Sequence, residues 1–156
     1  MEIAGLPLHP LLVHAVVVFV PLSAVMAVAL AVVPRWRWLL RWPTAALTVV
    51  GAGLAWLATE SGEALLEARP ELEALIEEHE EYGELLVIVM AIFAVLVVIS
   101  AWSLGGASPL ASGRGARESR IPALEKVLPV LLVLGAIGVA VVTVLVGDSG
   151  ARAVWG

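Results

Sequence analysis

Leu8-His9-Pro10-Leu11-Leu12-Val13-His14 stands at the start of the first of four long apolar segments and carries two of the chain's three histidines. The segment continues to about residue 33, near the ~20-residue length with which an α-helix crosses a bilayer. It is too long for a signal-peptide core, and Glu2 stands where a basic region would precede one, so we expect a retained span. Pro10 suits the first helical turn, because its missing N–H would have no partner there.

The composition is that of an integral membrane protein. Of the 156 residues, 61% are hydrophobic and only 15% are charged, and the mean hydropathy is +1.01. Soluble domains average roughly half apolar and a quarter charged residues. The sequence contains no cysteine, which excludes disulfides, thiolate metal sites, iron–sulfur clusters and covalently attached haem. A metal or cofactor site would therefore use imidazole and oxygen ligands.

The apolar pattern predicts an all-α fold, an integral membrane four-helix bundle that runs up-down-up-down as one transmembrane domain over residues 1–156. A connector rich in Trp and Arg follows the first span and suits a turn at the headgroup level. The third helix is expected to begin in water, with Pro70 in its first turn. The last residues are expected to lie at the membrane surface. The predicted spans cover residues 10–33, 43–59, 85–104 and 127–147.

Charge is divided between the two ends of this predicted bundle. Connectors 34–42 and 105–126 carry seven of the nine basic residues, whereas the acidic outer connector 60–84 carries ten of the fourteen acidic ones. Short basic loops stay in the cytoplasm, so the acidic connector, all three histidines and both termini are predicted to be extracytoplasmic. We expect a multi-pass protein of the inner or plasma membrane, in contact with the lipid bilayer. Basic residues confined to membrane-proximal loops argue against nucleic acid as a partner.

The opening His9-Pro10-Leu11-Leu12-Val13-His14, the three further spans and the closing stretch from Val146-Gly147-Asp148-Ser149-Gly150 to Trp155 resemble one family of small bacterial membrane proteins. This family is the domain of unknown function 2231, and the resemblance covers nearly the whole chain. Members sometimes occur fused to iron–sulfur or cytochrome c domains, so the resemblance implies a redox setting. It implies no particular reaction.

The candidate functional residues gather at the predicted outer end. His14 lies about one turn inside the apolar run, where ionisable residues are rare and tend to be functional. His79 lies on the apolar stripe of a glutamate-rich helix. The first and third helices of such a bundle are diagonal neighbours, so histidines on them could hold haem b between them. We predict His14 and His79 as the preferred cofactor ligands, with His9 as the substitute.

The levels of the histidines along the bundle argue against His14 and His79 as ligands of one group. At ~1.5 Å per residue, His14 lies roughly 4–5 Å inside the apolar boundary and His79 roughly 9 Å outside it, an offset of roughly 13 Å. His9 is closer in level to His79. A small metal site from His9, His14 and His79 with Asp148 or Glu60 is therefore an open alternative, because imidazole and carboxylate suit zinc, copper or iron.

The leading functional hypothesis is a redox or electron-transfer accessory protein that holds haem b or a transition-metal ion, within a membrane redox complex or as a homo-oligomer. The alternative is a cofactor-free structural or assembly subunit in which the outer polar cluster joins helix ends, with Asp148 as a cap of the tail or paired to Arg152. Proton or cation handling has less support, because the last three spans carry no charged residue deep inside. No nucleophile or phosphate-loop motif is present, so classical enzyme chemistry has the least support.

Overall fold

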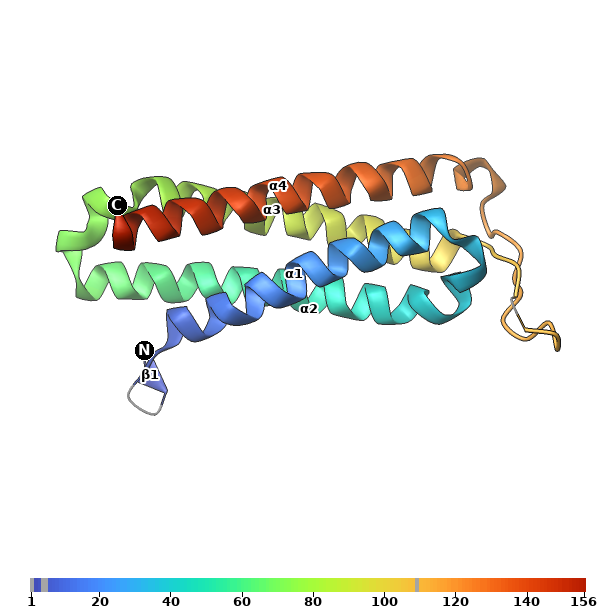
Figure 1. Ribbon diagram of the computed structural model, residues 1–156, viewed down its shortest axis with the longest axis horizontal. Coiled ribbons are helices and arrows are strands. Elements are labelled where there is room, and N and C mark those ends of the chain that lie inside the picture. Colours follow the sequence, from blue (N-terminus) through green and yellow to red (C-terminus); the bar gives the residue numbers. More distant parts are fainter. Residues whose placement is uncertain (1, 4–5, 109) are drawn as a thin grey trace.

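The computed structural model describes residues 2–3, 6–108 and 110–156, and its body is an antiparallel bundle of four helices (Figure 1). Both termini lie at the same end of the bundle. Two short antiparallel strands, β1 (Glu2–Ile3) and β2 (Leu6–Pro7), precede the first helix. The predicted set of four helices is confirmed. The helices are α1 (Leu8–Val32), α2 (Arg37–Ala68), α3 (Glu73–Ser103) and α4 (Val127–Trp155).

All four helices are long and apolar enough to cross a membrane. Large aliphatic side chains cover much of the outer surface, including Val18, Ile92 and Val144. On a soluble protein an apolar surface of this extent would promote association, whereas in a bilayer it faces acyl chains. The core between the helices is also apolar, and its fully buried members include Val20, Met90, Phe93, Leu132 and Val139.

The helices form a ring in chain order. α1 packs against α2 and α4, and α3 packs against the same two helices, so α1 and α3 are diagonal neighbours. Small hydroxyl residues let the helices approach closely, and three of them satisfy their polar atoms within their own helix. Ser23, Thr48 and Ser100 are buried, and each hydroxyl donates to a backbone carbonyl of its own helix.

The basic connector between α1 and α2 is shorter than predicted. Residues 34–42 were expected to form a turn at the headgroup level, but only residues 33–36 stand between the helices, and Pro34–Trp36 among them form one 3-10 turn. α2 begins at Arg37 and includes Pro43, where the sequence suggested a start. The guanidinium of Arg37 binds backbone carbonyls at the end of α1, which draws into the bundle a residue predicted to lie in the connector.

The acidic connector is mostly helical. α2 continues through the first part of this connector to Ala68, and α3 begins at Glu73 after a 3-10 turn at Pro70–Leu72, close to the start expected at Pro70. Pro70 ends the helix, because proline lacks an N–H and disfavours helical backbone in the residue before it. The 32 residues of α2 extend roughly 48 Å, which exceeds the ~30 Å hydrocarbon core. The inner parts of these long helices are the predicted spans 43–59 and 85–104.

α4 also continues beyond its predicted end at residue 147 and reaches Trp155. Asp148 and Arg152, one turn apart, form an ion pair of 3.0 Å along the helix surface, an arrangement that supports helix. The tail that was expected to lie at the membrane surface is therefore the last two turns of α4.

Candidate functional site: a pair of histidines between two helical hairpins

His9 ties the beginning of α1 to α2. Its Nδ1 lies 2.8 Å from the carbonyl oxygen of Ala58 and 3.4 Å from the hydroxyl of Ser61. A carbonyl oxygen only accepts hydrogen bonds, so the proton of the neutral ring is on Nδ1, which donates it to Ala58. The other ring nitrogen, Nε2, is then left with a free lone pair.

His79 repeats this arrangement between α3 and α4. Its Nδ1 lies 3.0 Å from the carbonyl oxygen of Val146 and 3.3 Å from the hydroxyl of Ser149. The same reasoning places the proton on Nδ1 and a lone pair on Nε2. Each histidine therefore joins the two helices of its own hairpin, α1 with α2 and α3 with α4.

The two imidazoles meet at the boundary between the hairpins. Their ring centroids are 6.2 Å apart, and the ring planes are nearly perpendicular, at 88°. Both side chains are half-buried. The structure thus brings together two imidazoles from diagonal helices at one level, as a shared ligand site requires, and each ring is oriented by a backbone carbonyl.

Glycines beside each ring make room for it. A Cβ built at Gly150 would lie 2.9 Å from Cε1 of His79, and one at Gly62 would lie 3.3 Å from Cε1 of His9. Real Cβ atoms essentially never approach to under 3.0 Å. The Ser-Gly pairs 61–62 and 149–150 therefore act together, since the serine contacts the ring nitrogen and the glycine leaves space for the ring.

The other predicted ligands do not join this pair. His14 is exposed and bonds the carbonyl of Pro10 in its own helix, at 2.6 Å. Glu60 is exposed, and Asp148 pairs with Arg152. Within the described ranges, no group of three or more His, Asp or Glu side chains could hold a metal ion. The predicted partnership of His14 with His79 is therefore not formed, and the substitute, His9, takes that place.

A family model described as "Predicted membrane protein (DUF2231)" matches residues 5–156, which include all four helices and both histidines. The chain belongs to the DUF2231 family. No curated protein and no solved structure matches it.

The two hairpins of this DUF2231 protein have the character of an internal repeat. Pro34 and Pro122, Ser61 and Ser149, and Gly62 and Gly150 are each separated by 88 positions, the separation that also relates Arg37 to Glu125. Each proline opens a 3-10 turn that leads into the second helix of its hairpin. In α1 and α3, positions separated by 70, the separation of the two histidines, share their burial. Such buried pairs are Val16 with Leu86, Val20 with Met90 and Ser23 with Phe93.

The sequence analysis missed the repeat and with it the serines and glycines of the site. The available signal was the recurrence of an acidic residue followed by Ser-Gly, at residues 60–62 and 148–150, near the outer end of the second and fourth segments. Together with the histidines at the start of the first and third helices, this recurrence indicates two similar hairpins.

A second polar cluster lies at the opposite, basic end and centres on Arg37, which is 4% exposed. Its guanidinium donates to Oε1 of Glu125 at 2.6 Å, to the carbonyl of Gly105 at 2.9 Å and to the carbonyls of Leu30 and Ala31 at 3.0 and 3.1 Å. These partners belong to the ends of α1 and α3 and to the residues before α4. One side chain therefore joins all four helices at this end.

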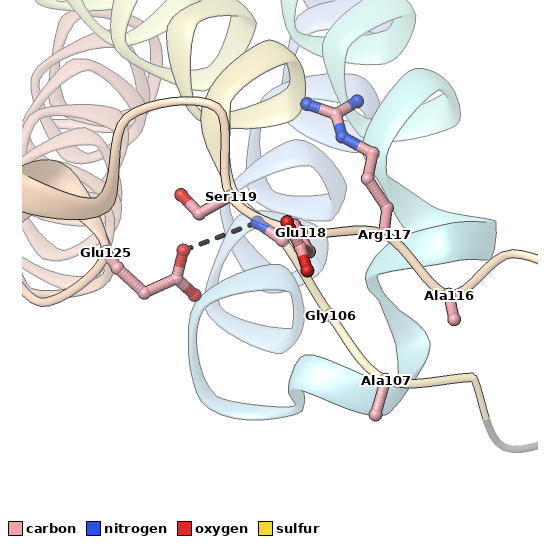
Figure 2. Close-up of a pocket in the computed structure, with 8 residues that line it drawn as sticks. Gly106, Ala107, Ala116, Arg117, Glu118, Ser119 and Glu125 are labelled. Carbon is pink, nitrogen blue, oxygen red and sulfur yellow. Dashed lines mark hydrogen bonds between the residues drawn. The ribbon is translucent and has the colours of Figure 1, made fainter.

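Glu125 completes this cluster beside a shallow surface pocket formed by the loop after α3 (Figure 2). Its Oε2 accepts a hydrogen bond from the N–H of Gly105 at 3.3 Å, the dashed line in Figure 2. Burial alone would raise the pKa of this carboxyl, but Ser119, Arg37 and Gly105 donate hydrogen bonds that together hold the pKa below its usual value. The carboxylate is thus the stable form at neutral pH, and it neutralises the buried guanidinium.

Proposed function

We propose that this DUF2231 protein is a redox accessory protein of the membrane that holds haem b through Nε2 of His9 and His79. The observation that carries the proposal is the pair of imidazoles from diagonal helices, each with Nδ1–H committed to a backbone carbonyl. Histidines that bind metals almost always donate their other ring N–H in this way, since the bond fixes the ring and raises its basicity.

The spacing of the rings fits one ion between them. A metal–nitrogen bond to imidazole takes about 2.0–2.1 Å, and the rest of the 6.2 Å between centroids is taken by the rings themselves. A flat group that enters between the hairpins would break neither histidine's hydrogen bond, because the bonds of His9 and His79 lie within the hairpins and not between them.

The number of protein donors favours haem over a bare ion. Zinc sites take three or four protein ligands, whereas haem iron needs only axial ligands from the protein. Two histidines supply that number, and the described part of the chain gathers no third imidazole or carboxylate beside them. A zinc, copper or iron ion held by the same two nitrogens remains the second form of the proposal.

In this role the chain's own residues position the group and keep it in place. The carbonyls of Ala58 and Val146 orient the rings, and the buried serines at 61 and 149 contact the same nitrogens. Haem b, when bound, would supply exchange of single electrons. The positive-inside rule would put the basic end in the cytoplasm and the histidine pair near the outer face, accessible to a redox partner on that side.

The test is an absorption spectrum, with elemental analysis, of protein purified gently from membranes. We expect a Soret band that shifts on reduction, and its loss in His9→Asn and His79→Asn. Asparagine keeps an N–H donor near the position of Nδ1 but has no counterpart of Nε2. The hydrogen bond to the neighbouring helix is therefore retained while the ligand nitrogen is removed. His14→Asn is the matched control and should keep the band. Protein without haem and without a stoichiometric metal would overturn the proposal.

The alternative is a structural or assembly subunit without a cofactor, which the two histidine ties themselves favour. Under this alternative the purified protein is colourless and metal-free. His9→Ala and His79→Ala then lower the melting temperature, and the asparagine variants restore it without any bound species being lost or gained.

A further inference from the structure

Three arginines converge at the basic end, where α2 packs against α3. Arg41 belongs to α2, and Arg117 and Arg120 belong to the loop that follows α3. Nη2 of Arg117 donates to the carbonyl of Trp102 on α3, and the guanidinium carbon of Arg120 lies 4.7 Å from the centre of the Trp102 ring. Arg41 lies close enough to Arg117 and Arg120 for their charges to interact with its own. In Figure 2, Arg117 points away from Glu125, so it takes no part in the buried ion pair.

Arg41 is buried, Arg117 is half-buried and Arg120 is exposed, and within the described residues none of the three has an acidic partner. The ion pairs found among the described residues are formed by Arg37 and Arg152. Arg41 is 8% exposed, and its Nε donates to the carbonyl of Arg37.

The electrostatics of the cluster call for an anion. Burial, together with the neighbouring charge of Arg120, lowers the pKa of Arg117 from its usual value. Like charges held close together in a partly desolvated place cost free energy, which an opposite charge relieves. Guanidinium groups form planar paired hydrogen bonds with phosphate oxygens, and arginine is the preferred side chain for this purpose.

The surroundings of the cluster are those of the membrane surface. Trp36, Trp42 and Trp102 are exposed at this end, and tryptophans gather at the level of lipid headgroups. Further along α3 toward the centre of the bundle, Val98 and Ile99 are exposed aliphatic residues. A phosphate at the arginines would therefore have apolar surface directly below it, as a phospholipid requires and a free phosphate does not.

We propose that Arg41, Arg117 and Arg120 form a binding site for the phosphate group of an anionic phospholipid in the leaflet at the basic end of the bundle. Basic pockets between membrane helices on the cytoplasmic side bind anionic headgroups in this way. The site is independent of the histidine pair at the other end.

The test measures binding of phosphatidylglycerol, and of phosphatidylcholine with the same acyl chains, to the purified full-length protein in neutral detergent. We expect Arg120→Gln to weaken binding of phosphatidylglycerol about fivefold, the effect of one charge at a membrane surface, and to leave phosphatidylcholine unaffected. The fold should survive, because Arg120 holds Ser103 through its backbone N–H. Arg114→Gln removes the same charge from the same loop, away from Trp102, and should weaken binding by less than about twofold.

Equal losses for Arg120→Gln and Arg114→Gln would mean diffuse attraction and would overturn the site, as would equal binding of the two lipids by the parent protein. Arg41→Lys, which keeps the charge but loses the planar fork, should retain the fold and weaken binding. Inorganic phosphate serves as competitor: displacement of the lipid by millimolar phosphate would assign the arginines to a soluble phosphate and overturn the lipid assignment.

Discussion

Among the glycines of the second and fourth helices, Gly62 and Gly150 are those whose nearest neighbour is a histidine ring. A Cβ at Gly150 would overlap the His79 ring at 2.9 Å, and one at Gly62 would press on His9 at 3.3 Å, whereas Gly147 has nothing within 4 Å. The positions of both rings therefore depend on a missing side chain in the neighbouring helix. This dependence makes the site testable without altering a histidine.

Gly150→Ala should destabilise the protein by about 1–3 kcal/mol, the usual cost of overpacking, because the His79 ring must move off the Val146 carbonyl. Gly62→Ala should cost less, since its neighbour has to yield by only a few tenths of an ångström. The control, Gly147→Ala, should stabilise by up to about 1 kcal/mol, the difference in helix propensity. Unfolding in detergent measures all three, and equal effects at 147 and 150 would contradict the geometry.

At the scale of the helices, the side chain of Arg37 connects the four helices at the basic end. Arg37 donates to carbonyls in the last turn of α1, to the carbonyl of Gly105 two residues after α3, and to Glu125 before α4. The ends of helices need such partners, because the last carbonyl groups find no N–H donor within the helix itself. Arg37 and Glu125 occupy equivalent positions in the two hairpins, so this contact joins the repeats to each other.

Arg37→Gln should lower the free energy of unfolding by about 1–3 kcal/mol, the cost of leaving buried acceptors without a donor, since Glu125 itself is only half-buried. The carbonyls of α1 would lose their donor, whereas Glu125 would keep the N–H of Gly105. Arg35→Gln, a change at an exposed position two residues earlier, should stay within about 0.5 kcal/mol of the parent protein. Denaturant titration in mixed micelles separates the two, and a small effect at Arg37 would mean that water replaces its contacts.

The acid stability of this end should depend on Glu125. Its pKa is lower in the folded protein than the usual value of about 4.3 for the unfolded chain. The contribution of a carboxyl with a lowered pKa is fully present above the unfolded pKa and is lost as the pH falls through the folded one. Glu125→Gln should therefore lower the melting temperature at pH 7. The difference in melting temperature between the parent protein and this variant should narrow as the pH falls below about 4. A difference that is constant with pH would exclude this role.

At the scale of the whole molecule, the protein is two helical hairpins joined by a short turn at Pro70–Leu72. Each hairpin carries one histidine tie, one Ser-Gly pair and one 3-10 turn that opens with proline. α1 packs on α4 and α2 packs on α3, so the hairpins contact each other along two helix pairs. The connector between them contributes little to this packing.

Cutting the chain at this connector should leave the bundle assembled. A protease site inserted between Arg69 and Pro70, cleaved after purification, should give two fragments that elute together and keep their helical signal. The same site inserted after Ser112, within the loop of the second hairpin, is the matched control and should behave alike. Separation of the fragments after the first cut alone would mean that the hairpins do not hold each other through α1–α4 and α2–α3 packing.

Long apolar runs determined the number and order of the helices, because a segment of about 20 apolar residues has few alternatives to a spanning helix. Their ends were predicted less well. Pro43 and Gly147 are typical of helix ends, yet α2 and α4 continue past them. Contacts from elsewhere in the chain, such as those of Arg37 with α1 and of Ser149 with His79, outweigh these local preferences.

The sequence by itself determined that the protein has four apolar helices, a basic end and an acidic end, and histidines near the acidic end, since these follow from composition and order along the chain. Only the tertiary structure decided that His9, and not His14, meets His79. The two candidates are five residues apart on one helix, so they point to different sides. Which side faces the bundle depends on how α1 packs against α2 and α4, and that rotation is a property of the assembled bundle.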